Sequence, residues 1–389
     1  MSSKSRWLIF LVSTPLVVLA AVGGLLGASS VARQQSMSHL KVFNDVLSLI
    51  MSNYVEPVDV DKVMDGAMRG LADGLDPSSA FLSPSEVKAI ETAAALPAGD
   101  VGLVVTRQFY LRVVGVRDGS PGAKAGIRTG DFLRGIDGKP TRDLSAFTGS
   151  RLLLGMAGSK VDLAIIRGNA AEPHTVTLVR EAVKPELVTG RKLPSGEAYV
   201  RVSSFRAGAA AALGKEIDRL RQAGASSAVV DLRGTADGTP EEGIAAARLF
   251  VKSGTLATRA GRSTDKTVVA AAAGDGAITL PVVVLVSNGT ANAAEILAAA
   301  LSDNHRAPLV GEPTAGIAGV QHLVKLPEGR GLWLTYARYL TASGDPIHEH
   351  GLRPDVGVEE PTVAFGDAPP SVDAALTKAV ERLKAKKAA

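Results

Sequence analysis

The spacing of hydrophobic residues predicts helices near the start of the chain. Between residues 36 and 96, apolar side chains such as Val42 and Val46 recur at intervals of three and four, which is typical of amphipathic helices. A serine-proline-serine-glutamate run that starts at Ser83 predicts a helix start, because a serine cap, an early proline and a following glutamate suit that end of a helix. We therefore expect an N-terminal helical segment over residues 36–96.

From residue 97 to residue 182 the pattern changes to short runs of β-branched residues separated by glycines. Such runs predict strands, and they lie at residues 103–105, 111–116, 161–166 and 174–180. Between the second and third runs lie the small-residue run Gly119-Ser120-Pro121-Gly122 and the pair Asp137-Gly138, which predicts a tight turn with positive φ. The order of these features resembles a PDZ domain.

The PDZ resemblance implies a groove that binds peptides. A PDZ domain adds a peptide to the edge of its sheet and holds the terminal carboxylate with backbone N–H groups. The matching loop here consists of Val101, Gly102, Leu103 and Val104, in which glycine leaves the backbone accessible. The alternative interpretation is that Gly102 is only a turn glycine. We expect this domain to bind protein or peptide C-termini.

Strand and helix patterns alternate between residues 183 and 360. Apolar strand-like runs lie at residues 198–202, 228–232 and 280–286, and helical patterns lie at residues 210–223, 241–251 and 291–302. This alternation predicts an α/β core with a buried, partly parallel sheet. Ligands bind such sheets beyond the carboxyl ends of the strands, so the candidate loops are residues 233–239, 287–291 and 314–321. Residues 361–389 predict a tail with a short helix.

The first 35 residues predict a membrane anchor. Trp7–Gly27 is an uncharged, mostly apolar stretch that follows Lys4 and Arg6, and a stretch of about 18 or more apolar residues is long enough to cross a bilayer as a helix. The alternative is a cleaved secretory signal that ends near Ala32. Both interpretations place the rest of the protein outside the cytoplasm. We expect a single-pass protein of the cytoplasmic membrane with its body in the periplasm or another extracytoplasmic space.

Composition excludes several other classes of function. Hydrophobic residues make up 46% of the 389 residues and charged residues 21%, which is typical of globular domains. The net charge of +4 comes without a basic run, so no nucleic-acid partner is expected. The chain has no cysteine, which excludes disulfides and a cysteine nucleophile. His348-Glu349-His350 lacks the spacing of a helical zinc motif, and we expect no metal and no cofactor.

Short motifs in a fixed order resemble the carboxyl-terminal processing peptidases, also called tail-specific proteases. They span residues 42–358 and include the bend Gly74-Leu75-Asp76-Pro77. Later motifs are Asp231-Leu232-Arg233, Gly289-Thr290-Ala291, Gly311-Glu312-Pro313-Thr314 and Gly351-Leu352-Arg353-Pro354-Asp355. The resemblance implies a peptidase-like α/β core and, in active members, a serine–lysine dyad. In such a dyad a neutral lysine removes the serine proton and backbone N–H groups stabilise the oxyanion.

The positions that carry the dyad are replaced in this chain. The resemblance places the nucleophile at Asn292 and the base at Ile317. An asparagine amide is not a usable acyl nucleophile and isoleucine accepts no proton, and loss of such a unit costs about a millionfold in turnover. Gly238 in the oxyanion loop and Gln321 at the dyad-supporting position are retained. We therefore predict a pseudopeptidase with no catalytic residues at these positions.

A second hypothesis keeps the chain active with a relocated nucleophile. Thr290 or Ser287 would attack the substrate, with Lys325 or His322 as the base, and the protein would be a serine endopeptidase that cleaves C-terminal tails. The same side chains also suit ordinary roles in turns and at strand ends. The replaced pair at positions 292 and 317 favours the first hypothesis.

The whole chain therefore predicts a multi-domain α/β protein with an N-terminal membrane helix, a helical segment, a β-rich PDZ domain and a peptidase-like core. The favoured function is that of an adaptor or regulator of envelope proteolysis that binds protein C-termini. An active peptidase relative is a further partner that this function implies.

Overall fold

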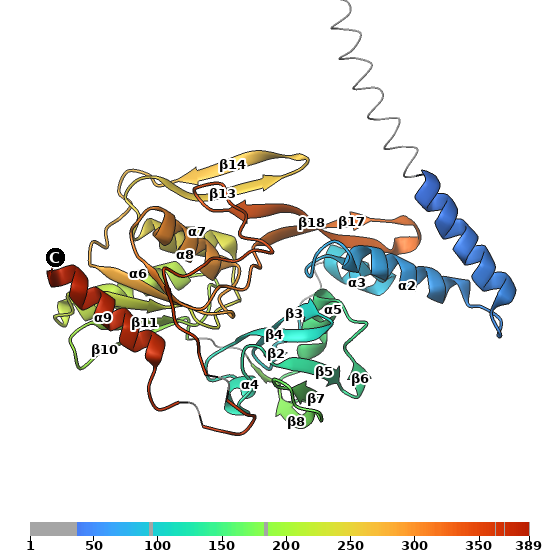
Figure 1. The fold of residues 1–389 in the computed structure, drawn as a ribbon, viewed down its shortest axis with the longest axis horizontal. Coiled ribbons are helices and arrows are strands. Elements are labelled where there is room, and N and C mark those ends of the chain that lie inside the picture. Colours follow the sequence, from blue (N-terminus) through green and yellow to red (C-terminus); the bar gives the residue numbers. More distant parts are fainter. Residues whose placement is uncertain (1–36, 93–95, 183–185, 362, 369, 389) are drawn as a thin grey trace, which may run out of the picture. The chain divides into compact units, whose positions relative to one another are not determined.

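The computed structural model describes residues 37–92, 96–182, 186–361, 363–368 and 370–388. The chain divides into two compact units, Met1–Met68 and Arg69–Ala389, and Figure 1 shows the elements along them. The predicted membrane segment at Trp7–Gly27 lies outside the described residues. Within the described ranges, no helix is both long enough and apolar enough to cross a lipid bilayer.

Helices form most of the N-terminal part of the chain, as the spacing predicts. Residues 37–53 are helical, and apolar side chains on them, including Leu40 and Leu49, are exposed. They are followed by α2 (Val60–Asp73) and α3 (Pro84–Glu91). The cap predicted at Ser83 is present, because its N–H donates to Glu86 Oε2 (2.9 Å) and the Glu86 N–H donates to its Oγ (3.4 Å).

The expectation of a helical segment over residues 36–96 was wrong at residues 80–82. Residues Ala80–Leu82 form a short strand, β1, which pairs antiparallel with β18 (Gly331–Leu340). A three-residue strand has no periodicity of its own, and here it exists because a distant strand supplies its hydrogen-bond partners. Local spacing therefore could not reveal it.

The PDZ-like region is an antiparallel sheet with its own core. Its strands, in spatial order, are β3 (Leu103–Gln108), β4 (Tyr110–Val116), β5 (Phe132–Ile136), β7 (Lys160–Ile166) and β8 (His174–Val179), with β6 (Lys139–Pro140) beside β5. The first, β3, is an edge strand, and α5 (Ala146–Leu153) packs against it. Asp137 and Gly138 adopt φ values of 49° and 73°, as the turn prediction requires.

A short helix and a pair of short strands complete this region. The small-residue run noted at residues 119–122 leads into the short helix α4 (Pro121–Lys124), and β2 (Gly99–Asp100) pairs antiparallel with β9 (Glu181–Ala182). The pairing of β2 with β9 joins the first and last residues of the region, and β2 directly precedes the edge strand β3 in the chain.

The α/β core contains the predicted, partly parallel sheet. Its order is β10 (Val188–Lys192), β11 (Ala198–Val202), β12 (Ala228–Asp231), β15 (Val282–Val286), β16 (Leu309–Gly311) and β19 (Val356–Gly357), and all pairs except the first are parallel. The helices are α6 (Ala209–Gln222), α7 (Pro240–Arg248), α8 (Ala293–Asp303) and α9 (Ala374–Ala388).

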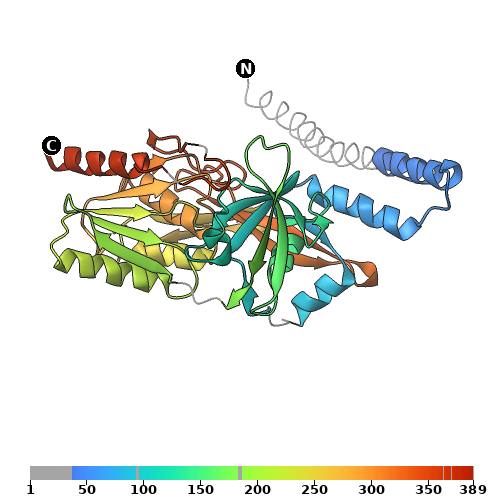
Figure 2. The same ribbon diagram turned by 90° about the horizontal axis from the view of Figure 1, so that it is seen from below.

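Alternate residues of the central strands are buried against different helices. Val230 and Val284 lie in the core shared with α6, α7 and α8, whereas Val229 and Val283 pack against α9. Figure 2 shows the sheet between α9 (red) and α6 (yellow-green). Burial on both faces explains why these strands appear in the sequence as continuous apolar runs.

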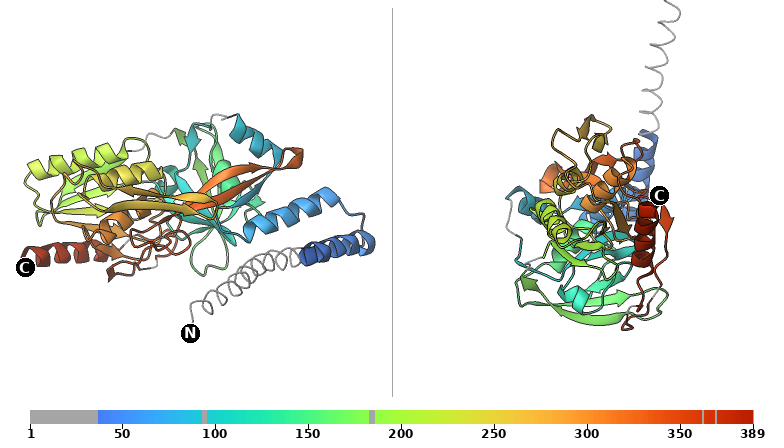
Figure 3. Two further views of the ribbon diagram at one scale, coloured as in Figure 1. Left: turned by 90° about the horizontal axis from the view of Figure 1, so that it is seen from above. Right: turned by 90° about the vertical axis from the view of Figure 1, so that its left-hand side faces the viewer.

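A second sheet was not predicted. It is built from β14 (Thr264–Ala270), β13 (Thr255–Gly261), β18, β1 and β17 (Gly319–Lys325), with a short 3₁₀ turn, η1 (Pro327–Gly329), between β17 and β18. Figure 3 shows β17 and β18 (orange) as a long antiparallel ribbon. Most side chains of β14 are exposed, so its sequence lacks the apolar alternation from which strands are predicted.

Candidate functional site

Three loops meet at the carboxyl ends of neighbouring parallel strands. They follow β12, β15 and β16, and they contain Gly238, Asn292 and Ile317 respectively. The Asn292 N–H donates to the Ile317 C=O (3.0 Å), and Asn292 Nδ2 donates to the Gly238 C=O (3.1 Å). The structure thus brings together Gly238 and the two positions predicted to replace the dyad.

Asn292 adopts an unfavourable backbone conformation between β15 and α8. Its φ and ψ angles are 53° and −119°, a region that costs a residue with a side chain on the order of 1–3 kcal/mol. Strained turns between a strand and a helix are used in hydrolases to present a nucleophile. Here the turn presents an amide, and the NH₂ group of that amide is bonded to Gly238.

Glu295 holds the two loops around positions 292 and 317 in place. Its buried carboxylate accepts hydrogen bonds from the N–H groups of Gly316 (2.7 Å), Ile317 (2.8 Å) and Asn292 (3.1 Å), and from the hydroxyl of Thr314. Burial raises the pKa of the Glu295 carboxyl to about 7, although these hydrogen bonds oppose the shift. The backbone frame of the site therefore depends on one carboxylate.

Ile317 makes the predicted base position apolar. Together with Val104 it packs against a small cluster formed by Val114, Ala236 and Ala291. Two of these residues, Val104 and Val114, belong to the PDZ sheet. The position assigned to a lysine is therefore part of an apolar contact between the PDZ region and the core.

Two glycines allow close backbone contact across this interface. A Cβ on Gly115 would lie 2.8 Å from the Ala236 Cβ, and a Cβ on Gly289 would lie 2.6 Å from Thr129 Oγ1. Such distances are too short for carbon atoms, so both positions require glycine. An ion pair between Arg201 and Asp118 (3.0 Å) adds a polar contact between the core and the PDZ region.

Gly238 also has a conformational reason to be glycine. Its φ is 109°, and a Cβ at this position would overlap the backbone of Phe205. Its loop is held by hydrogen bonds from Phe205 N–H to Asp237 C=O (3.2 Å) and from Thr239 N–H to Phe205 C=O (3.0 Å). The retained glycine thus keeps the loop close to Asn292.

Gln321 belongs to a polar cluster that sequence reasoning missed. Gln321 Nε2 donates to Thr335 Oγ1 (3.1 Å), and that hydroxyl donates to Asp76 Oδ1 (3.1 Å). His348 Nε2 lies 3.9 Å from the same oxygen, and burial lowers the pKa of this histidine. The motif around Asp76 indicated that this bend matters, but the side chains next to Asp76 lie on β18 and in a later loop.

The hydroxyls of the relocated-nucleophile hypothesis have structural roles. Thr290 Oγ1 donates to the Leu232 C=O (2.9 Å) and accepts the Ser287 N–H (3.0 Å). The Ser287 hydroxyl accepts the N–H groups of Gly234 and Gly289, each at 3.2 Å. Both side chains are buried.

The two side chains proposed as bases in that hypothesis, Lys325 and His322, have other partners. Lys325 is largely exposed and forms an ion pair with Glu91. The ring of His322 stacks on Tyr336 with a centroid distance of 4.4 Å. Neither pairing involves Thr290 or Ser287.

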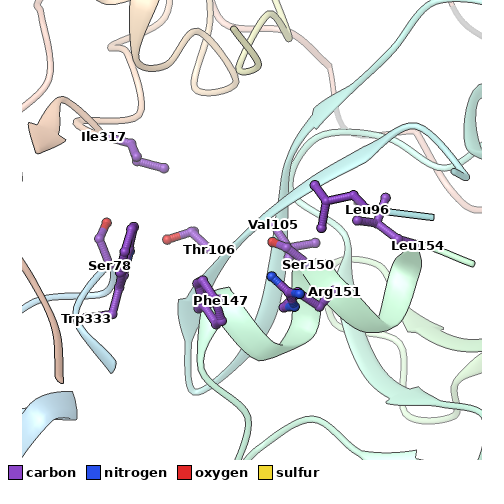
Figure 4. Close-up of a pocket in the computed structure, with 11 residues that line it drawn as sticks. Ser78, Leu96, Val105, Thr106, Phe147, Ser150, Arg151, Leu154, Ile317 and Trp333 are labelled. Carbon is purple, nitrogen blue, oxygen red and sulfur yellow. The ribbon is translucent and has the colours of Figure 1, made fainter. Parts of the chain in front are cut away.

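A pocket of about 310 Å³ extends from the groove between β3 and α5 to Ile317. Figure 4 shows Ile317 and Ser78 across this space from Thr106. The rings of Trp333 and Phe147 lie close together, with a centroid distance of 5.5 Å. The lining residues are Ser78, Leu96, Val105, Thr106, Ala146, Phe147, Ser150, Arg151, Leu154, Ile317 and Trp333. The edge of the PDZ sheet and Ile317 thus share one pocket.

The predicted peptide-binding loop lies at the start of β3. Val101 and Leu103 are buried in the PDZ core, and Val104 packs near Ile317. Gly102 has a φ of 79°, and a Cβ there would overlap the Ser120 side chain. Its glycine is therefore required by packing, and a role in binding a peptide remains a prediction.

Comparison with known families agrees with this architecture. Residues 197–358 match the peptidase family S41, and residues 112–167 match the PDZ domain. The carboxy-terminal processing protease CtpA of Bacillus subtilis is 32% identical over 364 residues, covering 92% of this chain and 78% of that protein. A carboxyl-terminal-processing protease of Synechocystis is 32% identical over 315 residues, covering 79% and 74% respectively.

A solved structure gives the same result. The photosystem II D1 C-terminal processing protease superposes with a TM-score of 0.68 at 31% identity, covering 80% of this chain and 86% of that one. The chain is therefore a member of the carboxyl-terminal processing peptidases, family S41, with a PDZ domain.

Proposed function

We propose that this chain is a noncatalytic member of its family that binds segments of other proteins. The observation that supports this most directly is the pair Asn292 and Ile317. The loops that carry them form a hydrogen-bonded frame, but an amide and an alkyl group cannot act as a nucleophile and a base. The candidate replacements, Thr290 and Ser287, are bonded to backbone groups.

The PDZ domain supports binding of peptide C-termini. Because the pocket beside β3 reaches Ile317, a bound segment would lie along the replaced site without being cut. Such a protein would act as an adaptor or regulator of envelope proteolysis, presenting segments to an active peptidase relative or withholding them from it.

The proposed location is the outer side of the cytoplasmic membrane, with Trp7–Gly27 as the anchor. The uncharged stretch behind Lys4 and Arg6 supports it. Cell fractionation tests this proposal: recovery of the intact chain in the cytosol would contradict it.

The proposal that the chain is noncatalytic is tested with an unstructured, C-terminally tagged substrate. The full-length protein in detergent is compared with the double variant Asn292→Ser plus Ile317→Lys and with Asn292→Ser alone. We expect no cleavage by the natural protein, and cleavage by the double variant but not by the single one, because a serine needs a base to attack.

Cleavage by the natural protein would contradict the proposal. Labelling with a fluorophosphonate, followed by peptide mapping, would then show whether the modified residue is Thr290 or Ser287. Mapping identifies the nucleophile directly, without substitutions that would also remove the structural hydrogen bonds of these residues.

A further inference from the structure

The loop that precedes the edge strand β3 already holds a carboxylate of this chain. Asp100 is 8% exposed. Its Oδ1 accepts the Gly102 N–H (2.7 Å), and its Oδ2 accepts Arg117 Nη2 (3.0 Å). In PDZ recognition, backbone N–H groups of this loop are the donors that hold the carboxylate of a bound C-terminus. The carboxylate of Asp100 therefore occupies one of the donors that a ligand would use.

The surrounding bonds keep the loop in this conformation. The Arg117 N–H donates to the Gly102 C=O (2.8 Å), and the Gly122 N–H donates to the Val101 C=O (2.9 Å). The positive φ of Gly102 and its tight packing on Ser120 restrict the backbone further. An aspartate that bonds to the N–H two residues ahead is a common turn device, but in this loop it also removes a donor from the groove.

The electrostatics of the loop also act against a second carboxylate. Arg117 is 12% exposed at its side chain and is already paired with Asp100. A ligand carboxylate at the Gly102 N–H would lie close to the Asp100 charge, and like charges in a partly buried site repel. To bind there, it would have to displace Asp100 from both partners.

The rest of the groove is still suited to binding a strand. β3 is at the edge of its sheet. Because the Gly102 C=O is bonded to Arg117, the next residue, Leu103, directs its backbone groups to the open side of the strand. Beyond it, Val105, Thr106 and Phe147 line the pocket between β3 and α5. Backbone pairing and side-chain contacts remain available to an extended segment.

We propose that Asp100 takes the place of the ligand carboxylate, so that this groove binds extended segments from within a polypeptide and gains nothing from a free C-terminus. The ligand class is an extended segment with apolar residues at alternate positions, because alternate side chains of an added strand face the groove. This inference rests on the proposed peptide-binding function and changes its ligand class from C-termini to internal segments.

The test uses short fluorescein-labelled peptides with apolar residues at alternate positions. Each sequence is made as a free acid, as a C-terminal amide, and with extra residues after the same end. Binding to the full-length protein in detergent is measured by fluorescence anisotropy. The measured quantity is the ratio of free-acid affinity to amide affinity.

We expect a ratio at or below one for the natural protein, with the extended form binding as well as the amide. In Asp100→Gly, the freed Gly102 N–H should raise the ratio to about tenfold, the effect of one hydrogen bond to a charged group. In Asp100→Asn the amide oxygen still accepts the Gly102 N–H but carries no charge, so the ratio should lie near one. Phe147→Ala should weaken all three peptide forms equally.

A natural protein that prefers the free acid about tenfold, with no change in Asp100→Gly, would overturn the inference. Binding of free acids alone would overturn it as well. Thermal melting identifies a variant that fails to fold. If Asp100→Gly does not fold, the ratio for the natural protein decides, and a preference of about tenfold for the free acid then overturns the inference. Absence of binding by every variant would overturn the inference and the peptide-binding function together, whereas the proteolysis assay tests catalytic inactivity separately.

Discussion

Two buried carboxylates, Glu295 in the core and Asp100 in the PDZ region, both accept hydrogen bonds from backbone N–H groups, but their surroundings differ. The partners of Glu295 are neutral: three N–H groups and the Thr314 hydroxyl. Asp100 has one N–H partner and the guanidinium of Arg117. Glu295 is compensated by hydrogen bonds, whereas Asp100 is compensated by a charge as well.

This difference separates the structural role of Glu295 from the binding role proposed for Asp100. Glu295 joins residues of two loops and thereby keeps positions 292 and 317 adjacent. Among the described residues the Asp100 carboxylate bonds only to its own loop and to Arg117, but in the proposal it occupies a donor that faces a groove. Loss of Glu295 should therefore change the stability of the fold, and loss of Asp100 should mainly change which peptides bind.

The largest expected effect is on stability when Glu295 is removed. Glu295→Ala leaves the N–H groups of Gly316 and Ile317 without their acceptor in a buried site and leaves the Asn292 N–H with only the Ile317 C=O. We expect a loss of about 3–5 kcal/mol in the free energy of unfolding. Urea denaturation measures this loss. A loss no larger than that caused by Asp100→Gly would break the distinction between the two carboxylates.

The second effect is a pH dependence that comes from Glu295. Its folded-state pKa is raised to about 7, above the value of about 4.3 for an exposed glutamate. The resulting stability is fully present below the unfolded-state pKa and is lost as the pH rises through about 7. We expect the natural protein to lose on the order of 3 kcal/mol across this window relative to Glu295→Gln.

Denaturant titrations of both proteins at several pH values measure the difference. Comparison with Glu295→Gln removes the contributions of other groups, since the variant shares them. Parallel stability curves for the two proteins would show that Glu295 does not titrate in this range.

The smallest effect is expected at Arg117. Arg117→Met leaves the Asp100 carboxylate with the Gly102 N–H but without its cation, and the site is only partly open to water. We expect a loss of about 1–2 kcal/mol, less than for a fully buried pair. The double variant Arg117→Met plus Asp100→Asn should recover most of this loss, and failure to recover it would indicate that the Arg117 side chain stabilises the loop by packing.

The predictions from sequence were most accurate for elements whose own residues show the pattern of burial or of local hydrogen bonding. The strand predicted at residues 198–202 matches β11, and those predicted at 228–232 and 280–286 match β12 and β15 to within a few residues. These strands are apolar on both faces because helices cover both faces of the sheet. The cap at Ser83 and the turn at Asp137 were also predicted correctly, since the chemistry of each lies within a few residues.

The second sheet could not be predicted in the same way. β1 is too short to show a period, and β14 has mostly exposed side chains. Both are strands because other strands, distant or adjacent, supply hydrogen bonds to their backbones. The same holds for the cluster of Asp76, Gln321 and Thr335, whose members come from separate parts of the chain.

The sequence by itself determined the family and the alternation of strands and helices, and it led to the prediction that Asn292 and Ile317 stand at the dyad positions, because these depend on residue identity and short-range order. The tertiary structure decided how those residues are used. It placed Ile317 in an apolar contact with the PDZ sheet, committed Thr290 and Ser287 to backbone groups, and set Asp100 on the donor of Gly102. Each of these outcomes depends on which buried groups meet after folding, and a buried polar group must find a partner wherever the fold provides one.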